Sequence, residues 1–255
     1  MAFRQAAFTE SIKFNSASSC DLLNLYKNAV IKSIKDDSAR KPSCTIAPSS
    51  IRCARKQWFR LRNTDPDVLE LPDLALAYKA SIGTDRHKYI QSVLKSALGE
   101  DWIDVSEYLK ANPISFDYTL TKSNYETLVQ IADPPVRFAC DGIIRLNGKI
   151  FLLEIKTSEY YSWVSLTKEK DIHRDQILSY CALLGIHNVL FVYEERMNGE
   201  WKCFENNFTD SECRAVLNGI NDIQDFVKDN IAPPALQIGD YMCKNCEYKI
   251  KCKEW

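Results

Sequence analysis

Three ionisable side chains in the middle of the chain, Asp141, Glu154 and Lys156, have the types and spacing of a catalytic cation site. Carboxylates that face each other on a sheet lie about 5 Å apart and repel. A pair of carboxylates kept in this arrangement indicates a divalent cation that both oxygen ligands bind. The alternative is a solvated sheet face on which the lysine neutralises both acids. The apolar run 150–153 argues against a fully exposed strand and favours the site.

A predicted hairpin brings these side chains together. Its turn is Asn147-Gly148, because a type I′ turn needs positive φ at both central positions and this dipeptide accepts it. A two-residue loop sets the register of the strands, and counting outward from it places Asp141 opposite Glu154. Lys156 follows two residues later and therefore shares the face of Glu154.

Length and composition bound the class of protein. The 255 residues are enough for one domain, or for one domain with a sizeable accessory part. Apolar residues make up 45% and charged residues 26%, as in ordinary globular proteins. The formal net charge of −1 means that a nucleic-acid surface must be a local patch.

The chain is expected to be cytoplasmic. No stretch approaches the run of about 20 apolar residues that a membrane span needs, and residues 1–14 lack the apolar core of a secretory signal. Thiols stay reduced in that compartment, so the ten cysteines favour metal binding over disulfides. Cys140 and Cys181 lie in apolar surroundings and are expected in the core.

Periodicity and capping signals predict a mixed chain of helices and strands. Helices are expected from Ser19 to about residue 40, over 73–98, over 168–184, and from the capping box Thr209–Glu212 to Lys228. Strands are expected over 115–120, 127–131 and 188–194, with an aromatic polar loop over 158–167. Ser49 and Ser50 are candidate N-caps for the segment that follows them.

The basic segment 51–62 allows two interpretations. It carries five cations with Trp58 and Phe59 between them, a composition that suits phosphate contacts and base stacking. The alternative is an amphipathic helix whose two aromatic rings belong to the core.

The C-terminal tail carries a second candidate centre. Cys243, Cys246 and Cys252 form a C-x2-C-x5-C pattern, and soft thiolates select zinc or iron–sulfur centres. Three ligands leave one position open, which Cys53 or Cys44 could fill. With Cys53, the centre would join both ends of the chain and give the tail its order.

The motifs in order resemble the RecB-like branch of the PD-(D/E)XK nuclease superfamily. A helical GTxxH segment at 83–87 precedes Asp141, then Glu154-Ile155-Lys156, then Gln176 and Tyr180 four residues apart on a helix. The bracketing cysteines resemble its iron–sulfur members, among them CRISPR-associated Cas-four nucleases, their phage-encoded relatives and the AddB nuclease domain. Each motif is weak alone, whereas six in this order make a specific match from residue 49 onward.

The resemblance implies a role for each matching residue. Mn²⁺ or Mg²⁺ would be bound by His87, Asp141, Glu154 and the carbonyl of Ile155. Lys156 would orient or activate the attacking water and stabilise charge on the phosphate. The substrate strand would be positioned by Gln176 and Tyr180. A [4Fe–4S] cluster would be held by Cys53, Cys243, Cys246 and Cys252.

The expected fold is α/β (α+β), with a central mixed sheet of the nuclease core flanked by helices. The expected division is a single nuclease domain over 1–255: a mainly helical part (1–130), a catalytic core (131–208), and a helix with the cysteine tail (209–255). The expected activity is exonucleolytic hydrolysis of single-stranded DNA ends. Expected partners besides DNA are a CRISPR integrase, a recombination or replication protein, or a second copy. The alternative is a non-catalytic, zinc- or cluster-stapled DNA-binding or scaffold module.

Overall fold

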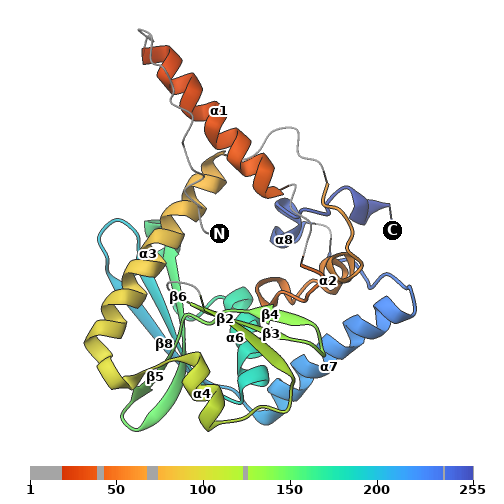
Figure 1. The fold of residues 1–255 in the computed structure, drawn as a ribbon. Coiled ribbons are helices and arrows are strands. Elements are labelled where there is room, and N and C mark those ends of the chain that lie inside the picture. The colour runs from red at the N-terminus through yellow and green to blue at the C-terminus, as the bar shows by residue number, and fades with distance from the viewer. Residues whose placement is uncertain (1–18, 39–42, 68–73, 123–125, 238, 255) are drawn as a thin grey trace.

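The computed structural model describes residues 19–38, 43–67, 74–122, 126–237 and 239–254 (Figure 1). No helix in these ranges is long and apolar enough to cross a bilayer. The helices and strands follow one another as α1 (Ser19–Ser38), η1 (Pro48–Ser50), α2 (Ala54–Leu61), α3 (Leu74–Leu98), η2 (Gly99–Asp101), β1 (Trp102–Ile103), α4 (Val105–Ala111), β2 (Tyr118–Lys122), β3 (Thr127–Ile131), β4 (Val136–Phe138), β5 (Gly142–Leu146), β6 (Lys149–Ser158), α5 (Tyr160–Val164), α6 (Asp171–Leu184), β7 (Asn188–Glu195), β8 (Trp201–Asn207), α7 (Asp210–Lys228), α8 (Tyr241–Lys244) and η3 (Lys251–Lys253).

A five-stranded mixed sheet is the centre of the molecule. Its strand order is β1-β5-β6-β7-β8. β6 and β7 are parallel, and the other pairs are antiparallel. The parallel pair requires a crossover connection, which α5 and α6 provide. The strands β2, β3 and β4 form a separate antiparallel sheet. The predicted class, a central mixed sheet flanked by helices, is confirmed.

The β5–β6 hairpin has the predicted turn and register. Asn147 and Gly148 have φ values of 50° and 76°, and Leu146 pairs with Lys149. The pairing continues to Gly142 opposite Leu153. Asp141 therefore lies where β5 begins, next to the position of Glu154 on the neighbouring strand.

Strand β6 is covered on both faces, which explains its nearly continuous burial. Leu153 and Ile155 point to the α3 side, where they pack with Ile90 and neighbouring apolar side chains. The opposite face carries Leu152 in the larger core, which also takes in α6 and α7. Because strand side chains alternate, Glu154 and Lys156 belong to this second face.

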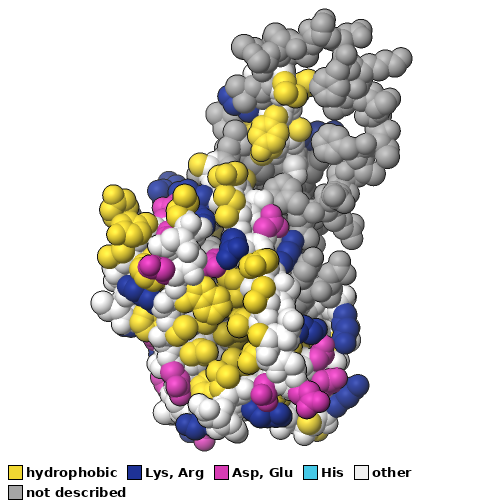
Figure 2. All heavy atoms as spheres, turned by 90° about the vertical axis from the view of Figure 1, so that its left-hand side faces the viewer, with side chains coloured by type: hydrophobic (Ala, Val, Ile, Leu, Met, Phe, Trp, Pro, Cys, Tyr) yellow, Lys and Arg dark blue, Asp and Glu magenta, His cyan; other side chains and the backbone are white. Residues whose placement is uncertain are grey.

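Hydrophobic side chains also gather on the outer surface of the α3 side (Figure 2). Within α3, Tyr78, Tyr89 and Val93 are exposed. In α1, Leu22 and Tyr26, two of the apolar side chains that the structure describes there, are likewise more than half exposed. Helical periodicity predicted these helices correctly but not what covers them.

Several local predictions are confirmed and others are wrong. α7 begins with the expected capping box of Thr209 and Glu212, and α3 spans the predicted range. Residues 158–167 are not simply a loop, because they contain α5. Ser49 and Ser50 are not N-caps: Ala47 caps η1 and Cys53 caps α2, neither with a side-chain bond.

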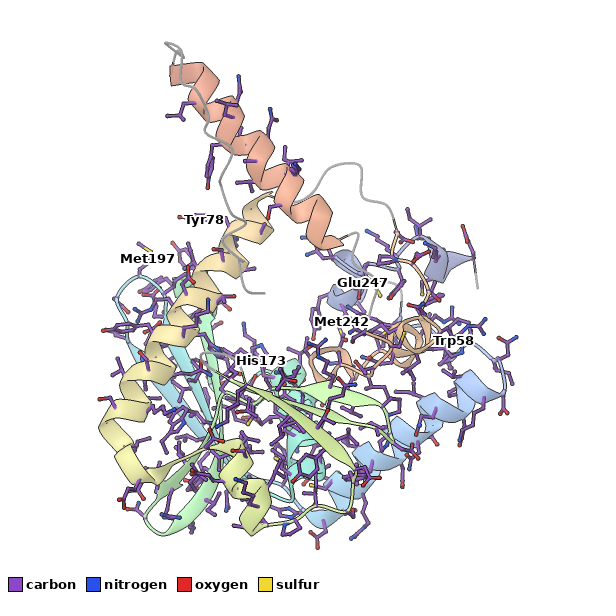
Figure 3. All side chains as sticks on the ribbon, in the orientation of Figure 1. Trp58, Tyr78, His173, Met197, Met242 and Glu247 are labelled. Atoms are coloured by element: carbon purple, nitrogen blue, oxygen red, sulfur yellow. The ribbon has the colours of Figure 1, made fainter. Side chains whose placement is uncertain are left out.

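The base-stacking interpretation of segment 51–62 is wrong for its aromatic rings. Trp58 and Phe59 are 1% and 2% exposed, and Phe59 stacks on Tyr248 of the tail with ring centroids 5.0 Å apart. Figure 3 shows Trp58 between the tail and α7, and its indole nitrogen donates to the Phe226 carbonyl. The rings form a small core of their own with Tyr248.

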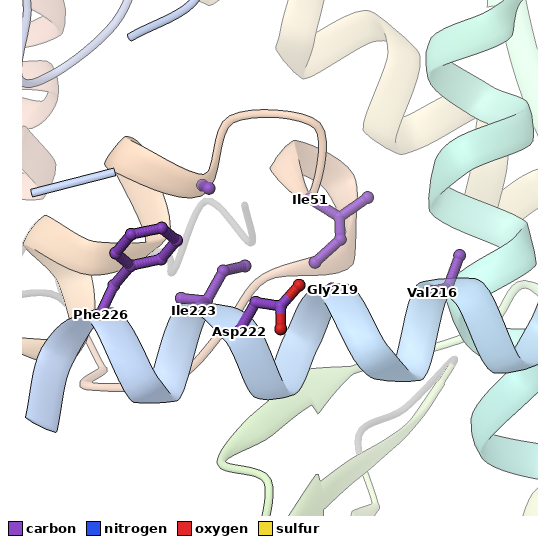
Figure 4. Close-up of a pocket in the computed structure, with 7 residues that line it drawn as sticks. Ile51, Val216, Gly219, Asp222, Ile223 and Phe226 are labelled. Carbon is purple, nitrogen blue, oxygen red and sulfur yellow. The ribbon is translucent and has the colours of Figure 1, made fainter. Parts of the chain in front are cut away.

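A recess lies where α2 and η1 meet α7 (Figure 4). Its volume is about 270 Å³ and its lining is apolar apart from one carboxylate. The lining residues are Ile51, Ala54, Val216, Gly219, Asp222, Ile223 and Phe226. This surface is chemically unlike the ionisable cluster on the hairpin.

Candidate metal centre and cysteine cluster

Helix α3 brings His87 to the hairpin. Its Nε2 lies 2.9 Å from Asp141 Oδ2 and 2.7 Å from the Ile155 carbonyl oxygen. Ligands at neighbouring positions around Mg²⁺ or Mn²⁺ stand about 3 Å apart, as metal–oxygen bonds of about 2.1 Å require. Both oxygen atoms therefore stand at such a ligand-to-ligand distance from His87 Nε2.

Asp141 is held in place across the hairpin. Its Oδ2 accepts the Ile155 backbone N–H at 2.6 Å, and its backbone carbonyl accepts the Gln91 side-chain amide at 2.8 Å. The next residue must be small, because a Cβ on Gly142 would stand 2.7 Å from the Trp102 ring. Backbone and packing together fix this carboxylate.

Glu154 is the most telling member of the cluster. Its side chain is fully buried and forms an ion pair with Lys156. Apart from that pair, neither carboxylate oxygen has a hydrogen-bond partner in the described part of the chain. Burial raises the pKa of Glu154 to about 7, Lys156 opposes this rise, and Asp141 adds to it. A buried carboxylate with unused oxygens fits a cation ligand.

The electrostatics of His87 agree with a cation site. Burial alone would lower its pKa, but Asp141 and Glu126 together outweigh this and raise the pKa to about 10. The negative potential that holds this proton would also attract a cation, which would displace the proton on binding to Nε2. The donor set of one imidazole, two carboxylates and one carbonyl suits Mn²⁺ or Mg²⁺.

Glu126 joins this cluster and was missed by the sequence reasoning. It precedes β3, and its Oε1 lies 3.8 Å from His87 Nδ1. Ligand atoms of His87, Glu126 and Asp141 all lie within 4.8 Å of one another. No local pattern marks this glutamate, because it comes from the segment leading into the second sheet and reaches the hairpin only through the fold.

Gln176 and Tyr180 share one face of α6, as their spacing predicts. Gln176 Nε2 donates to the Tyr180 hydroxyl at 2.8 Å. Tyr180 is 4% exposed and stacks on Phe138 with centroids 4.9 Å apart. In this arrangement Tyr180 orients Gln176 from within the core, and its contact with a substrate stays a prediction.

The four predicted cluster cysteines lie in one neighbourhood. Burial raises the pKa of the Cys53 thiol, and nearby Cys243 and Cys252 add to the rise. Burial also raises the pKa of Cys246, to which Cys53 contributes. Cys44, the alternative fourth ligand, is exposed.

The tail is also held by contacts of the protein alone. Arg55 donates to the Pro233 carbonyl at 2.6 Å and to the Cys252 carbonyl at 3.2 Å. The backbone N–H of Asp67 donates to the Glu247 carbonyl at 2.7 Å. The sequence suggested that the tail has no hydrophobic core of its own and would gain its order from a metal centre. In the structure the tail shares a core and hydrogen bonds with the α2 region.

Comparisons with known proteins give a fold likeness only. No protein-family profile and no curated protein matches the chain. Among solved structures, SSO0001 has a TM-score of 0.50 at 19% identity, covering 91% of this chain and 98% of that protein. An alkaline exonuclease from Laribacter hongkongensis has a TM-score of 0.43 at 12% identity, covering 73% and 89%. Its complex with dAMP matches over the same shares at 14% identity, also with a TM-score of 0.43.

Proposed function

We propose that this protein is a metal-dependent nuclease that hydrolyses DNA phosphodiester bonds. One observation carries the proposal: His87 Nε2 stands within 2.9 Å of the Asp141 carboxylate and 2.7 Å of the Ile155 carbonyl, beside buried Glu154 and its partner Lys156. The resemblance to RecB-like nucleases, which rests on the order of the motifs, assigns functional roles to these same residues.

The residues of the site have different roles in the reaction. His87, Asp141, Glu154 and the Ile155 carbonyl would hold Mn²⁺ or Mg²⁺. A bound cation of this kind acts as a Lewis acid on a phosphoryl oxygen and lowers the pKa of water.

Lys156 places its ammonium group beside Glu154 at the edge of this donor set. There it orients the attacking water and stabilises the negative charge that develops on the phosphate. Gln176, held by Tyr180, positions the substrate strand.

The finer assignment rests on the family resemblance. In this assignment the protein is an exonuclease that acts on single-stranded DNA ends. Its setting is CRISPR adaptation, phage DNA processing or recombination, and its partner is an integrase or a recombination or replication protein. A structural [4Fe–4S] cluster on Cys53, Cys243, Cys246 and Cys252 is part of this proposal. The shared neighbourhood of these thiols supports it.

Incubation of the purified protein with labelled single-stranded DNA tests the function. Degradation is expected with Mn²⁺ or Mg²⁺ and none with EDTA. Glu154→Gln should abolish it, whereas Glu205→Gln, a change at an exposed position of β8, should not. A protein that binds DNA but cleaves no form of it would favour the alternative, a non-catalytic DNA-binding module.

Glu126→Ala is expected to weaken Mn²⁺ binding about 10- to 100-fold, because carboxylates that orient a ligating histidine have effects of this size. Glu126→Gln keeps an acceptor for Nδ1–H and should lose less. Isothermal titration with Mn²⁺ measures both variants in the absence of DNA. Equal affinity of Glu126→Ala and the unchanged protein, with His87→Ala impaired, would remove Glu126 from the centre.

A further inference from the structure

A second histidine lies on the Lys156 side of the sheet. His173 is in the first turn of α6, three residues before Gln176 and therefore on the same helical face. Its ring stacks on Tyr193 of β7, with centroids 5.6 Å apart. Tyr193 pairs with Lys156 across β6 and β7, so these two side chains lie on one face of the sheet. Figure 3 shows His173 near the centre of the molecule, at the end of α6.

Hydrogen bonds around Tyr193 accommodate a His173 tautomer that carries its proton on Nε2. The Tyr193 hydroxyl oxygen accepts the Lys170 backbone N–H at 3.0 Å and lies 2.8 Å from His173 Nδ1. A backbone N–H can only donate, whereas a hydroxyl group both accepts and donates, so we assign the hydroxyl proton to the bond with Nδ1. Burial raises the pKa of Tyr193 to about 12, which keeps that proton in place. His173 then carries its own proton on Nε2.

The surroundings of His173 favour an anion. Burial, together with the neighbouring Lys156 and Lys170, lowers its pKa to about 3. The imidazole is therefore neutral and lies beside two ammonium groups. Its Nε2–H has no acceptor in the described part of the chain, although the ring is only half-buried. A neutral donor next to two cations is an arrangement that suits a phosphate oxygen.

We propose that Nε2–H of His173 donates a hydrogen bond to a phosphodiester oxygen of the bound DNA strand, with Lys156 and Lys170 contributing charge to the same site. This inference rests on the proposed nuclease function and adds a strand-positioning residue to it. The contact is fixed by Tyr193, which holds the ring from the opposite nitrogen.

Binding of a short fluorescein-labelled single strand, with Ca²⁺ in place of Mn²⁺ to prevent turnover, tests the site by fluorescence anisotropy. His173→Ala should weaken binding about 10- to 100-fold, the range for a hydrogen bond to a charged group. The dependence of log K on log salt should not change, because a neutral donor releases no counterion. Lys170→Ala should instead reduce that slope by about one.

His173→Gln is the decisive variant, since its amide nitrogen can take the place of Nε2 and should restore most of the affinity. Tyr193→Phe, which removes the hydroxyl that fixes the tautomer, should lose part of it. Unchanged binding by His173→Ala overturns the inference, and so does an equal loss in His173→Gln, which would mark the ring as packing only. If the unchanged protein binds no single-stranded DNA, the proposed function fails and this inference falls with it.

Discussion

Replacing Lys156 by methionine is expected to slow DNA hydrolysis by about 1,000-fold, the loss typical for one group that stabilises charge or moves a proton in the transition state. Methionine keeps most of the side-chain volume against the core. The ammonium group that faces Glu154 is removed, so nothing at that position can orient water or neutralise the phosphate. Rates of nucleotide release under saturating Mn²⁺ measure the effect.

The same variant separates chemistry from cation binding. Removing a positive charge beside Glu154 should leave Mn²⁺ affinity unchanged or make it tighter, as Coulomb's law requires. Lys149→Met is the matched control, because Lys149 is an exposed lysine on the same strand and should retain full activity. Turnover within a few-fold of the unchanged protein in Lys156→Met would remove Lys156 from the mechanism.

The hairpin could be predicted from sequence because its information is local. Turn chemistry at Asn147-Gly148 sets the register, and strand alternation then decides which side chains share a face. The relation between Asp141 and Glu154 follows without any long-range contact. His87 needed more than this, because a lone helical histidine has no signal of its own. Only the order of motifs pointed to it.

The residues that could not be predicted depend on contacts between distant segments. Trp58 is an example: nothing in its own segment tells whether its ring meets a nucleic-acid base or a core. In the structure the ring lies in a small core with Tyr248 and donates a hydrogen bond to the Phe226 carbonyl, and both residues come from the other end of the chain. Glu126 and His173 are similar cases, since each gains its place from an element that packs beside the hairpin or along the sheet.

The four cysteines also come from distant segments, the α2 region and the C-terminal tail. Replacing them therefore tests both the identity of the cluster and its contribution to stability. Anaerobically purified protein is expected to be brown, with broad absorbance near about 400 nm from a thiolate-bound cluster. Cys246→Ser or Cys53→Ser should abolish that absorbance. A colourless anaerobic sample with one zinc per chain would contradict the iron–sulfur assignment.

Loss of the cluster should lower the melting temperature of the protein, while the central sheet remains folded. A ligand present at about a thousand times its Kd contributes about 4 kcal/mol to stability, and each kcal/mol corresponds to about 2–4 °C in a chain of this size. Cys53→Ser is therefore expected to melt about 8–16 °C lower by scanning calorimetry. Because Phe59, Tyr248 and Arg55 still hold the tail against α2, the tail should loosen rather than detach, with slow proteolysis near Cys246.

Cys203→Ser, at an exposed cysteine of β8, should change neither colour nor melting temperature. Cys44→Ser decides the fourth ligand: if it, and not Cys53→Ser, loses the absorbance, then Cys44 holds the cluster.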